Sequence, residues 1–365
     1  MQDWLEKYAH LLVNYSLYLK PGERLFVRTS TLAEPLLKQV YLKALEAGAI
    51  VDWELGFEDQ EKMLVHAGKE QQLDYVAAGY KTAMEQFDAL LTIRAPHVSR
   101  QDFVAEPDKR KRRAEALQPY EQRYFQRLGD GSLKRCLCQY PTECGALHAG
   151  MSLDEYAGFI RNACFLNEED PSAHWKELSR YQQRLVDFLD HRDRIIYRHP
   201  EFEISFSVKD RKWMNSDGKA NMPSGEVFTS PVEDSVNGEI FFNYPSIYQD
   251  QEVEGIRLRV SHGAVVAWSA QKGGELLDRI FQLEGSRYFG EVAIGCNHNI
   301  RRPTKNILFD EKIGGTIHMA IGQSYLQTGG KNHSSIHWDM IAEMRNGGEI
   351  FADGELIYKD GAFLI

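Results

Sequence analysis

The hydrophobic pattern of this chain changes near residue 190, and this change constrains the fold more than any other feature of the sequence. Before it, segments with helical periodicity alternate with short β-rich runs. The first of these elements are a helix over residues 4–19, a strand at Arg24–Thr29, a helix from Leu32 to about Glu46 and a strand at Ala49–Leu55. Alternation of this kind predicts a parallel sheet covered by helices.

The same alternation continues to the end of the first half. Two more strands are predicted at Ala89–Ala95 and Leu133–Tyr140, followed by helices at Leu153–Phe165 and Ser172–Leu189. The charged segment PDKRKRRAEALQPYEQRYFQRL between the two strands is predicted to be a solvated helix. We therefore predict an α/β domain with a parallel sheet over residues 1–190.

The second half consists of short β-rich runs separated by Gly, Asn and Asp turns, such as GEIFFNY, GIRLRVS and TIHMAIG. Only the segment Gly273–Gly285 has a helical pattern. Runs of this length and spacing predict a predominantly β domain, a curved sheet or a barrel, over residues 191–365.

Composition excludes several classes of function. A chain of 365 residues is long enough for two cores, and its net charge of -10 gives no reason to expect nucleic acid or an anionic membrane as a partner. The N-terminus lacks the basic and apolar regions of a secretory signal, and no run approaches the roughly 18 apolar residues of a transmembrane helix. The odd count of 5 cysteines favours reduced thiols, so we expect a cytoplasmic protein.

Common catalytic signatures are absent from the sequence: it has no P-loop, no GxGxxG, no G-x-S-x-G and no HExxH. One cluster, Cys136, Cys138, Cys144 and His148, resembles a zinc-binding set. However, the first two cysteines lie in a run that reads as a buried strand. Buried structural cysteines are the better interpretation.

His337 and Asp339 lie two residues apart in the segment HSSIHWDM. In an extended strand they share one face, while Trp338 and Met340 fill the other. An imidazole beside a carboxylate could bind a metal ion, form part of a hydrolytic triad or make a hydrogen bond on the surface.

Three more residues in the β-rich half are of metal-ligand type. Glu226 in NMPSGEVFTSP and Glu291 in RYFGEVAIG each have apolar neighbours, and His318 lies in the apolar run TIHMAIG. A carboxylate in such surroundings is costly unless it is paired or bound to a metal. Together with His337 and Asp339, these residues suit two adjacent Zn²⁺, Co²⁺ or Mn²⁺ ions.

The strings NMPSGEVFTSP, RYFGEVAIG, LFDEKIGGTIHMAIGQSY and SSIHWDM, in this order, resemble the thermophilic aminopeptidase family, the M29 metallopeptidases. The resemblance implies an α/β domain followed by a β-rich catalytic domain, a homodimer, and a two-metal site that removes N-terminal residues from peptides. It implies a ligand set of Glu226, Glu291, His318, His337 and Asp339, with Glu311 as a further acidic member and Tyr325 beside the metals.

Catalytic roles follow from the chemistry of such a site. Glu291 or Glu311 is the candidate to carry a proton to the leaving amine, and Tyr325 could donate a hydrogen bond to the developing oxyanion. Two alternatives remain open at this level: a serine-type hydrolase that uses His337 and Asp339, and a metal-free interaction protein on the same fold. If the chain forms a dimer, aromatic residues could anchor the interface, namely Phe241, Phe242, Tyr244 and Tyr248.

Overall fold

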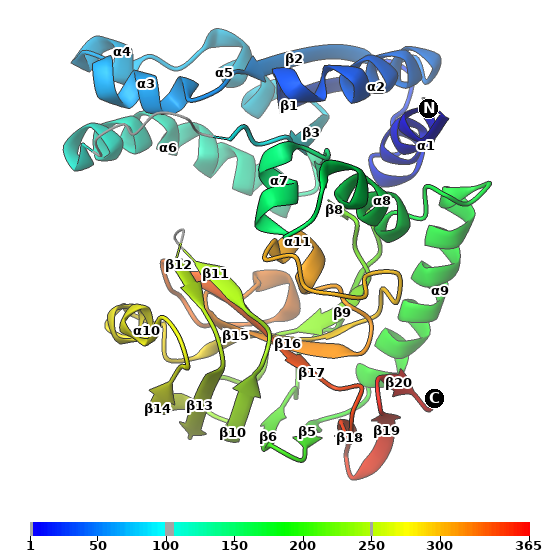
Figure 1. Cartoon of the computed structure of the whole chain (residues 1–365), viewed down its shortest axis with the longest axis vertical. Coiled ribbons are helices and arrows are strands. Elements are labelled where there is room, and N and C mark those ends of the chain that lie inside the picture. The colour runs from blue at the N-terminus through cyan, green and yellow to red at the C-terminus, as the bar shows by residue number, and fades with distance from the viewer. Residues whose placement is uncertain (1–2, 99–105, 249–250) are drawn as a thin grey trace. The chain divides into compact units, whose positions relative to one another are not determined.

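The computed structural model describes residues 3–98, 106–248 and 251–365 (Figure 1). Contacts divide the chain into two compact units, the first formed by Met1–Ser172 and Gly218–Met222, the second by Ala173–Asp217 and Pro223–Ile365. The change to β-rich structure falls between helix α9 (Pro171–Leu189) and strand β5 (Arg194–His199). A division into domains at residue 190 remains a prediction, since most of α9 is grouped with the second unit.

The first unit contains the predicted parallel sheet. Its strand order is β2-β1-β3-β4-β8, and every neighbouring pair is parallel. The strands are β1 (Arg24–Ser30), β2 (Ile50–Gly56), β3 (Ala89–Arg94), β4 (Lys134–Gln139) and β8 (Asn221–Met222). The edge strand β8 comes from a segment that leaves the second unit and returns to it.

Helices flank these strands in sequence as predicted, with several short helices that the sequence did not indicate. They are α1 (Asp3–His10), a π-helical turn (Leu11–Ser16), a 3₁₀ turn (Thr31–Ala33), α2 (Glu34–Glu46), α3 (Gln60–Ala67), α4 (Glu70–Asp74), α5 (Ala78–Gln86), α6 (Pro107–Gly129), α7 (Glu143–His148) and α8 (Leu153–Ala163). The segment predicted as one helix over residues 4–19 is thus α1 followed by a π-helical turn.

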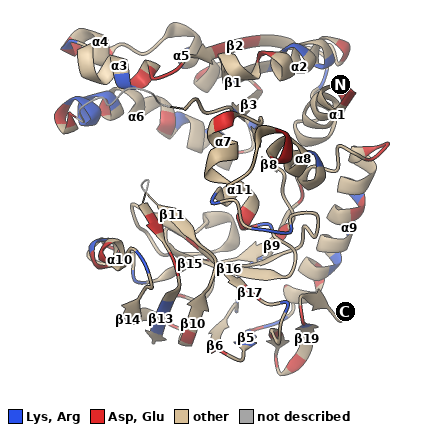
Figure 2. Ribbon diagram, viewed as in Figure 1, with Lys and Arg blue, Asp and Glu red and all other residues tan. Residues whose placement is uncertain are grey.

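Two arginines of the charged helix α6, whose basic residues are blue in Figure 2, pair with acidic residues of the helices α3 and α4. Arg112 contacts Asp74 at 2.7 Å and Glu70 at 3.0 Å, and Arg113 contacts Glu61 at 3.2 Å. These two arginines are therefore paired within their own unit. This agrees with a solvated helix and gives no support to a nucleic-acid surface.

Antiparallel sheets form the second unit, which confirms the predicted β-rich class. An eight-stranded sheet has the order β14-β13-β10-β6-β5-β18-β19-β20, and a five-stranded sheet has the order β17-β16-β15-β9-β7. The strands of the larger sheet are β5, β6 (Phe202–Ser207), β10 (Asn237–Phe242), β13 (Ile256–Ser261), β14 (Ala264–Ser269), β18 (Glu349–Ala352), β19 (Glu355–Lys359) and β20 (Ala362–Phe363). Those of the smaller are β7 (Met214–Ser216), β9 (Glu226–Thr229), β15 (Phe289–Gly295), β16 (Thr316–Gly322) and β17 (His337–Glu343).

The two sheets share one hydrophobic core with helix α9. Ile204 and Phe242 come from the larger sheet, Val292 and Met319 from the smaller, and Leu189 from α9. A two-stranded hairpin, β11 (Ser246–Tyr248) with β12 (Gln251–Val253), and the helices α10 (Gly274–Ile280) and α11 (Ile307–Asp310) complete the described elements, with a 3₁₀ turn at Leu326–Thr328. One face of the five-stranded sheet therefore packs into this core.

Two secondary predictions can be compared with this fold. Cys136 and Cys138 are buried free thiols on β4, and burial raises the pKa of Cys136 to about 12, as expected for structural cysteines. Within the described part of the chain, no helix is long and apolar enough to cross a membrane.

Candidate metal centre

The register of the five-stranded sheet brings five predicted ligands to one face. Residues directly opposite one another on paired strands lie on the same face. The relevant pairs are Gly295 with Glu226, Ala293 with His318, Ala320 with Asp339, and Gly322 with His337. Glu291 shares this face because it lies two residues before Ala293. The other face carries core residues that alternate with the ligands, including Val227, Ile294, Met319, Trp338 and Met340.

An irregularity in β15 determines on which face of the sheet the Glu291 side chain lies. Phe289 pairs with Ile321 and Glu291 pairs with Ala320, so Gly290 is an extra residue in the ladder. A β-bulge of this kind reverses the facing of the residues beyond it. Phe289 can therefore lie in the core while Glu291, two residues later, lies on the site face.

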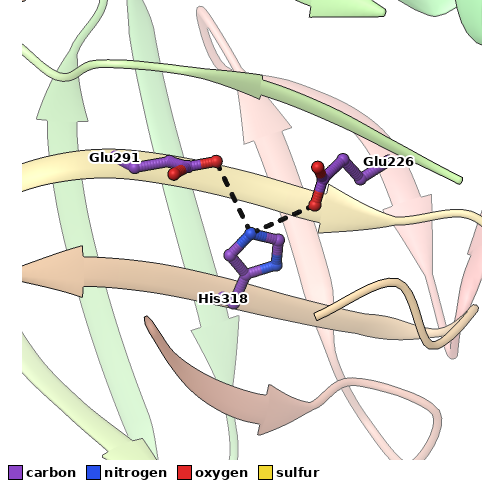
Figure 3. A group of neighbouring side chains, drawn as sticks. All are labelled: Glu226, Glu291 and His318. Atoms are coloured by element: carbon purple, nitrogen blue, oxygen red, sulfur yellow. Dashed lines mark ion pairs between the residues drawn. The ribbon is translucent and has the colours of Figure 1, made fainter. Parts of the chain in front are cut away.

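Glu226, Glu291 and His318 form the first group of side chains (Figure 3). His318 Nε2 lies 3.3 Å from Glu226 Oε2 and 3.7 Å from Glu291 Oε1. All three residues are buried, with exposed fractions of 4% or less. They reach the same point from strands β9, β15 and β16.

Glu291, His337 and Asp339 form the second group, so that Glu291 belongs to both. His337 Nε2 lies 3.1 Å from Glu291 Oε2 and 3.5 Å from Asp339 Oδ1. His337 Nδ1 lies 2.8 Å from the carbonyl oxygen of Gln323, to which it can donate a hydrogen bond. That bond fixes the ring and leaves Nε2 facing the carboxylates, as is usual for a metal-binding histidine.

Glu311 lies at the end of α11 and joins a third group with His318 and Asp339. Its Oε1 lies 2.5 Å from Nζ of Lys312, which also contacts Glu226 Oε1. Lys312 is 1% exposed. The ammonium group therefore balances part of the negative charge of the cluster.

The electrostatics of the cluster favour bound cations. Burial raises the pKa of Glu311 to about 7, although the Lys312 charge opposes the rise. Burial disfavours a charged His318, but the carboxylates around it, Glu291 first, outweigh burial and raise its pKa to about 9. For Asp339, burial is outweighed by His337, which lowers the pKa of the carboxyl to about 2. Buried negative charge of this density needs compensating positive charge.

Unpaired polar atoms point to the same conclusion. Glu226 Oε2, His318 Nε2 and Asp339 Oδ1 are buried and have no hydrogen-bond partner among the described residues. Buried polar atoms without partners are costly, and oxygen and imidazole nitrogen are ligands of Zn²⁺, Co²⁺ and Mn²⁺. The residues that are present therefore fit metal ions.

Tyr325 lies at the rim of the cluster, directly before the 3₁₀ turn. Its ring centroid is 5.2 Å from that of His337 and 5.4 Å from that of Phe228, and the residue is 38% exposed. The negative charge of Glu291, followed by burial, raises the pKa of the Tyr325 hydroxyl. The hydroxyl consequently remains a hydrogen-bond donor at physiological pH.

Comparison with known proteins identifies the family. The family model described as thermophilic metalloprotease (M29) matches residues 1–363. The chain belongs to the M29 metalloprotease family. Aminopeptidase 2 of Geobacillus stearothermophilus is 27% identical over 414 aligned residues, which cover 99% of this chain and 96% of that protein. Aminopeptidase PepS of Streptococcus thermophilus is 26% identical, with 99% and 98% covered.

A solved structure of the wild-type AmpT from Thermus thermophilus has the same fold. The TM-score is 0.83 at 22% sequence identity, and the alignment covers 99% of both chains. This M29 chain therefore has a full-length structural counterpart.

M29 membership and the geometry together weigh against both alternatives. The ring nitrogens of His337 face Glu291, Asp339 and the Gln323 carbonyl, and no serine hydroxyl of the described residues is paired with them. The ligand-type residues are all present and close together, which a metal-free interaction protein would not require. The serine-type and interaction-protein hypotheses therefore lose their support.

Sequence reasoning missed three contributors to this M29 centre: Lys312, Gly290 and Gln323. Lys312 follows Glu311 in DEKIGG, where a lysine among charged residues indicates a solvated turn. The bulge at Gly290 could have been suspected, because a glycine inside a strand pattern often marks one. Gln323 contributes only its backbone carbonyl, which no sequence signal identifies.

Proposed function

We propose that this chain is a two-metal aminopeptidase that removes N-terminal residues from peptides. The observation that carries the proposal is the shared carboxylate of Glu291, whose two oxygens face His318 and His337 respectively. Membership of a metalloprotease family supports a metal-dependent peptidase, and the relatives named aminopeptidases support action at the N-terminus.

Two ligand groups would hold the ions. Glu226, Glu291 and His318 would bind one, and Glu291, His337 and Asp339 the other, with Glu311 as a further ligand or a base. When bound, Zn²⁺, Co²⁺ or Mn²⁺ at such sites polarises a peptide carbonyl and makes water more acidic. No ion other than a divalent cation matches a set of buried carboxylates and imidazoles so well.

The chain's own residues then supply positioning and proton transfer. Tyr325, at the exposed rim, would donate its hydroxyl proton in a hydrogen bond to the carbonyl oxygen of the substrate as negative charge develops there. Glu311 would accept a proton from the attacking water and deliver it to the leaving amine. Lys312 contacts one oxygen of Glu311, so the other remains for this exchange.

Selection of the N-terminus would depend on the free α-amine of the substrate. An unprotonated amine has a lone pair that can bind a divalent cation held by these ligand groups, whereas the nitrogen of an acetylated end is an amide and cannot. Exopeptidase specificity would follow from this difference.

Metal dependence and amine dependence test the proposal together. Elemental analysis of the purified protein should give about two divalent ions per chain, the count that the two-metal mechanism requires. Dialysis against a chelator should abolish hydrolysis of a free-amine aminoacyl amide, and Co²⁺, Zn²⁺ or Mn²⁺ should restore it. The N-acetylated amide should not be cleaved. Activity in metal-free protein, or cleavage of the acetylated substrate, would contradict the proposal.

We also propose that the enzyme is a homodimer, as its resemblance to the family implies. The aromatic residues considered as interface anchors are already engaged within the second unit: Phe241 and Phe242 lie in the core, Tyr244 bonds to Glu343, and Tyr248 stacks on Trp338. Phe241 and Phe242 are buried in this core, whereas Tyr244 and Tyr248 are half-buried and stay candidate anchors of the interface. Light scattering should report twice the mass of one chain, and a monomer at micromolar concentration would contradict the dimer.

A further inference from the structure

Lys312 is a member of the cluster that neither binds an ion nor transfers a proton in the proposed mechanism. A buried ammonium is costly unless it is paired, and Lys312 is almost fully buried in the second unit. Its Nζ contacts two carboxylates that come from different elements, Glu226 on β9 and Glu311 at the end of α11. The lysine therefore joins two segments that are far apart in the sequence.

The contact with Lys312 gives the two oxygens of the Glu226 carboxylate different surroundings. Oε1 contacts Lys312, whereas Oε2 lies 3.3 Å from His318 Nε2 and has no hydrogen-bond partner among the described residues. A carboxylate held at one oxygen cannot rotate freely. The free oxygen is thereby aimed at the first ligand group.

Backbone contacts fix Lys312 relative to the turn that carries Glu226. The backbone N–H of Asn297 donates to the carbonyl of Lys312 at 3.0 Å, and the side chain of Asn297 donates to the carbonyl of Ser224 at 3.0 Å. Asn297 thus bridges the segment of Lys312 and the turn directly before β9. The fold therefore holds the Lys312 segment, and with it the ammonium group, in a defined position.

We propose that Lys312 is a positioning residue of the metal centre, which holds one oxygen of Glu226 and one of Glu311 so that the other oxygens are presented to the ions. This inference rests on the proposed two-metal function. Among the described residues, those of the second ligand group (Glu291, His337 and Asp339) make no hydrogen bond or ion pair with Lys312, so the ion that they would hold depends less on the lysine.

Metal titration of Lys312→Met tests the proposal. Without the ammonium, Glu226 and Glu311 repel each other and are free to turn away. One of the two ions should therefore bind roughly 10–100-fold more weakly, the usual effect of losing a residue that orients a ligand. The other ion should bind nearly as in the wild type. Lys212→Met, at an exposed lysine of the same unit, is the matched control and should leave both affinities unchanged.

Kinetics and a second variant distinguish positioning from a purely structural role. At saturating metal, Lys312→Met should recover much of its kcat with little change in KM, because occupancy is restored. Lys312→Arg keeps the positive charge, so it should retain more affinity for the weakened ion than Lys312→Met does. Should the Met variant fail to fold, Lys312→Gln, which removes the charge but keeps a hydrogen-bond donor, takes its place in each of these comparisons.

Two results would overturn the inference. One is a folded Lys312→Met protein that binds both ions with wild-type affinity. The other is a folded Lys312→Arg protein that binds metal no better than the Met variant. Failure of the proposed function would differ from either, because the wild-type protein itself would then bind fewer than two ions or keep its activity in chelator.

Discussion

At the scale of single residues, Glu291 differs from every other member of the cluster. Its two carboxylate oxygens face different histidines, so one side chain serves both ligand groups. Glu226 belongs only to the group with Glu291 and His318. The two glutamates should therefore respond differently to the same substitution.

Replacing Glu291 by Gln should weaken both ions, whereas Glu226→Gln should weaken one. The amide keeps the size of the side chain, but its nitrogen is a donor and cannot bind a cation. Elemental analysis after gel filtration at limiting metal gives the stoichiometry, with circular dichroism as the check on folding. A folded Glu291→Gln protein that retains two ions would remove Glu291 from the shared position.

Tyr325→Phe removes the hydroxyl at the rim of the cluster and keeps the aromatic ring. The ring contacts with Phe228 and His337 do not need the hydroxyl, so metal content and KM should change little. The kcat should fall by roughly 10²–10³-fold, the loss typical of one oxyanion donor. Steady-state kinetics on metal-loaded protein gives the answer, and a wild-type kcat would exclude Tyr325 from the mechanism.

At the scale of elements, the bulge in β15 depends on Gly290 having no side chain. A Cβ at this position would lie 2.4 Å from the carbonyl oxygen of Gln323 and 2.5 Å from that of Gly322. Both are backbone atoms, so relief requires movement of the strand end that precedes Tyr325 and His337. The Gly290 carbonyl also accepts a hydrogen bond from Ser230 at 2.6 Å, which restrains the bulge from the other side.

Gly290→Ala should lower the free energy of unfolding by about 1–3 kcal/mol, the usual cost of overpacking, and should weaken metal binding because Glu291 is displaced. The control is Gly274→Ala at the start of α10, where a Cβ would meet nothing within 4 Å. Denaturant unfolding and metal titration compare the two variants. Equal stability and affinity in both would mean that the bulge tolerates a side chain.

Much of the fold and most of the ligand set could be predicted from the sequence, since both depend on local patterns. The alternation in β16 and β17 separates His318 and Asp339 from Met319 and Met340, and the strand–helix alternation of the first half specifies the parallel sheet. Short helices such as α4, with 5 residues, have too few turns to show a period. Lys312 could not be assigned, because its burial depends on contacts with β9 that only the folded chain brings together.

At the scale of the whole molecule, the metal centre and the parallel sheet belong to separate compact units. All seven predicted site residues lie in the second unit, and the first unit has its own sheet and its own hydrophobic cluster around Phe26 and Tyr80. Metal bound at these residues would therefore stabilise one unit directly. Metal removal should affect the two units unequally.

Chelation should lower the stability of the second unit and leave the first largely unchanged. A ligand that binds only the folded state stabilises it by about 2.7 kcal/mol at 100 times its dissociation constant, and chelation also restores repulsion among the buried carboxylates. Hydrogen exchange followed by mass spectrometry should show faster exchange in β15, β16 and β17 after chelation, with β1 and β3 unaltered. The folded Glu291→Gln protein is the control: having already lost metal, it should respond little to chelator. Equal acceleration in β1 and β15 would show that the units unfold together and that metal stabilises the chain as a whole.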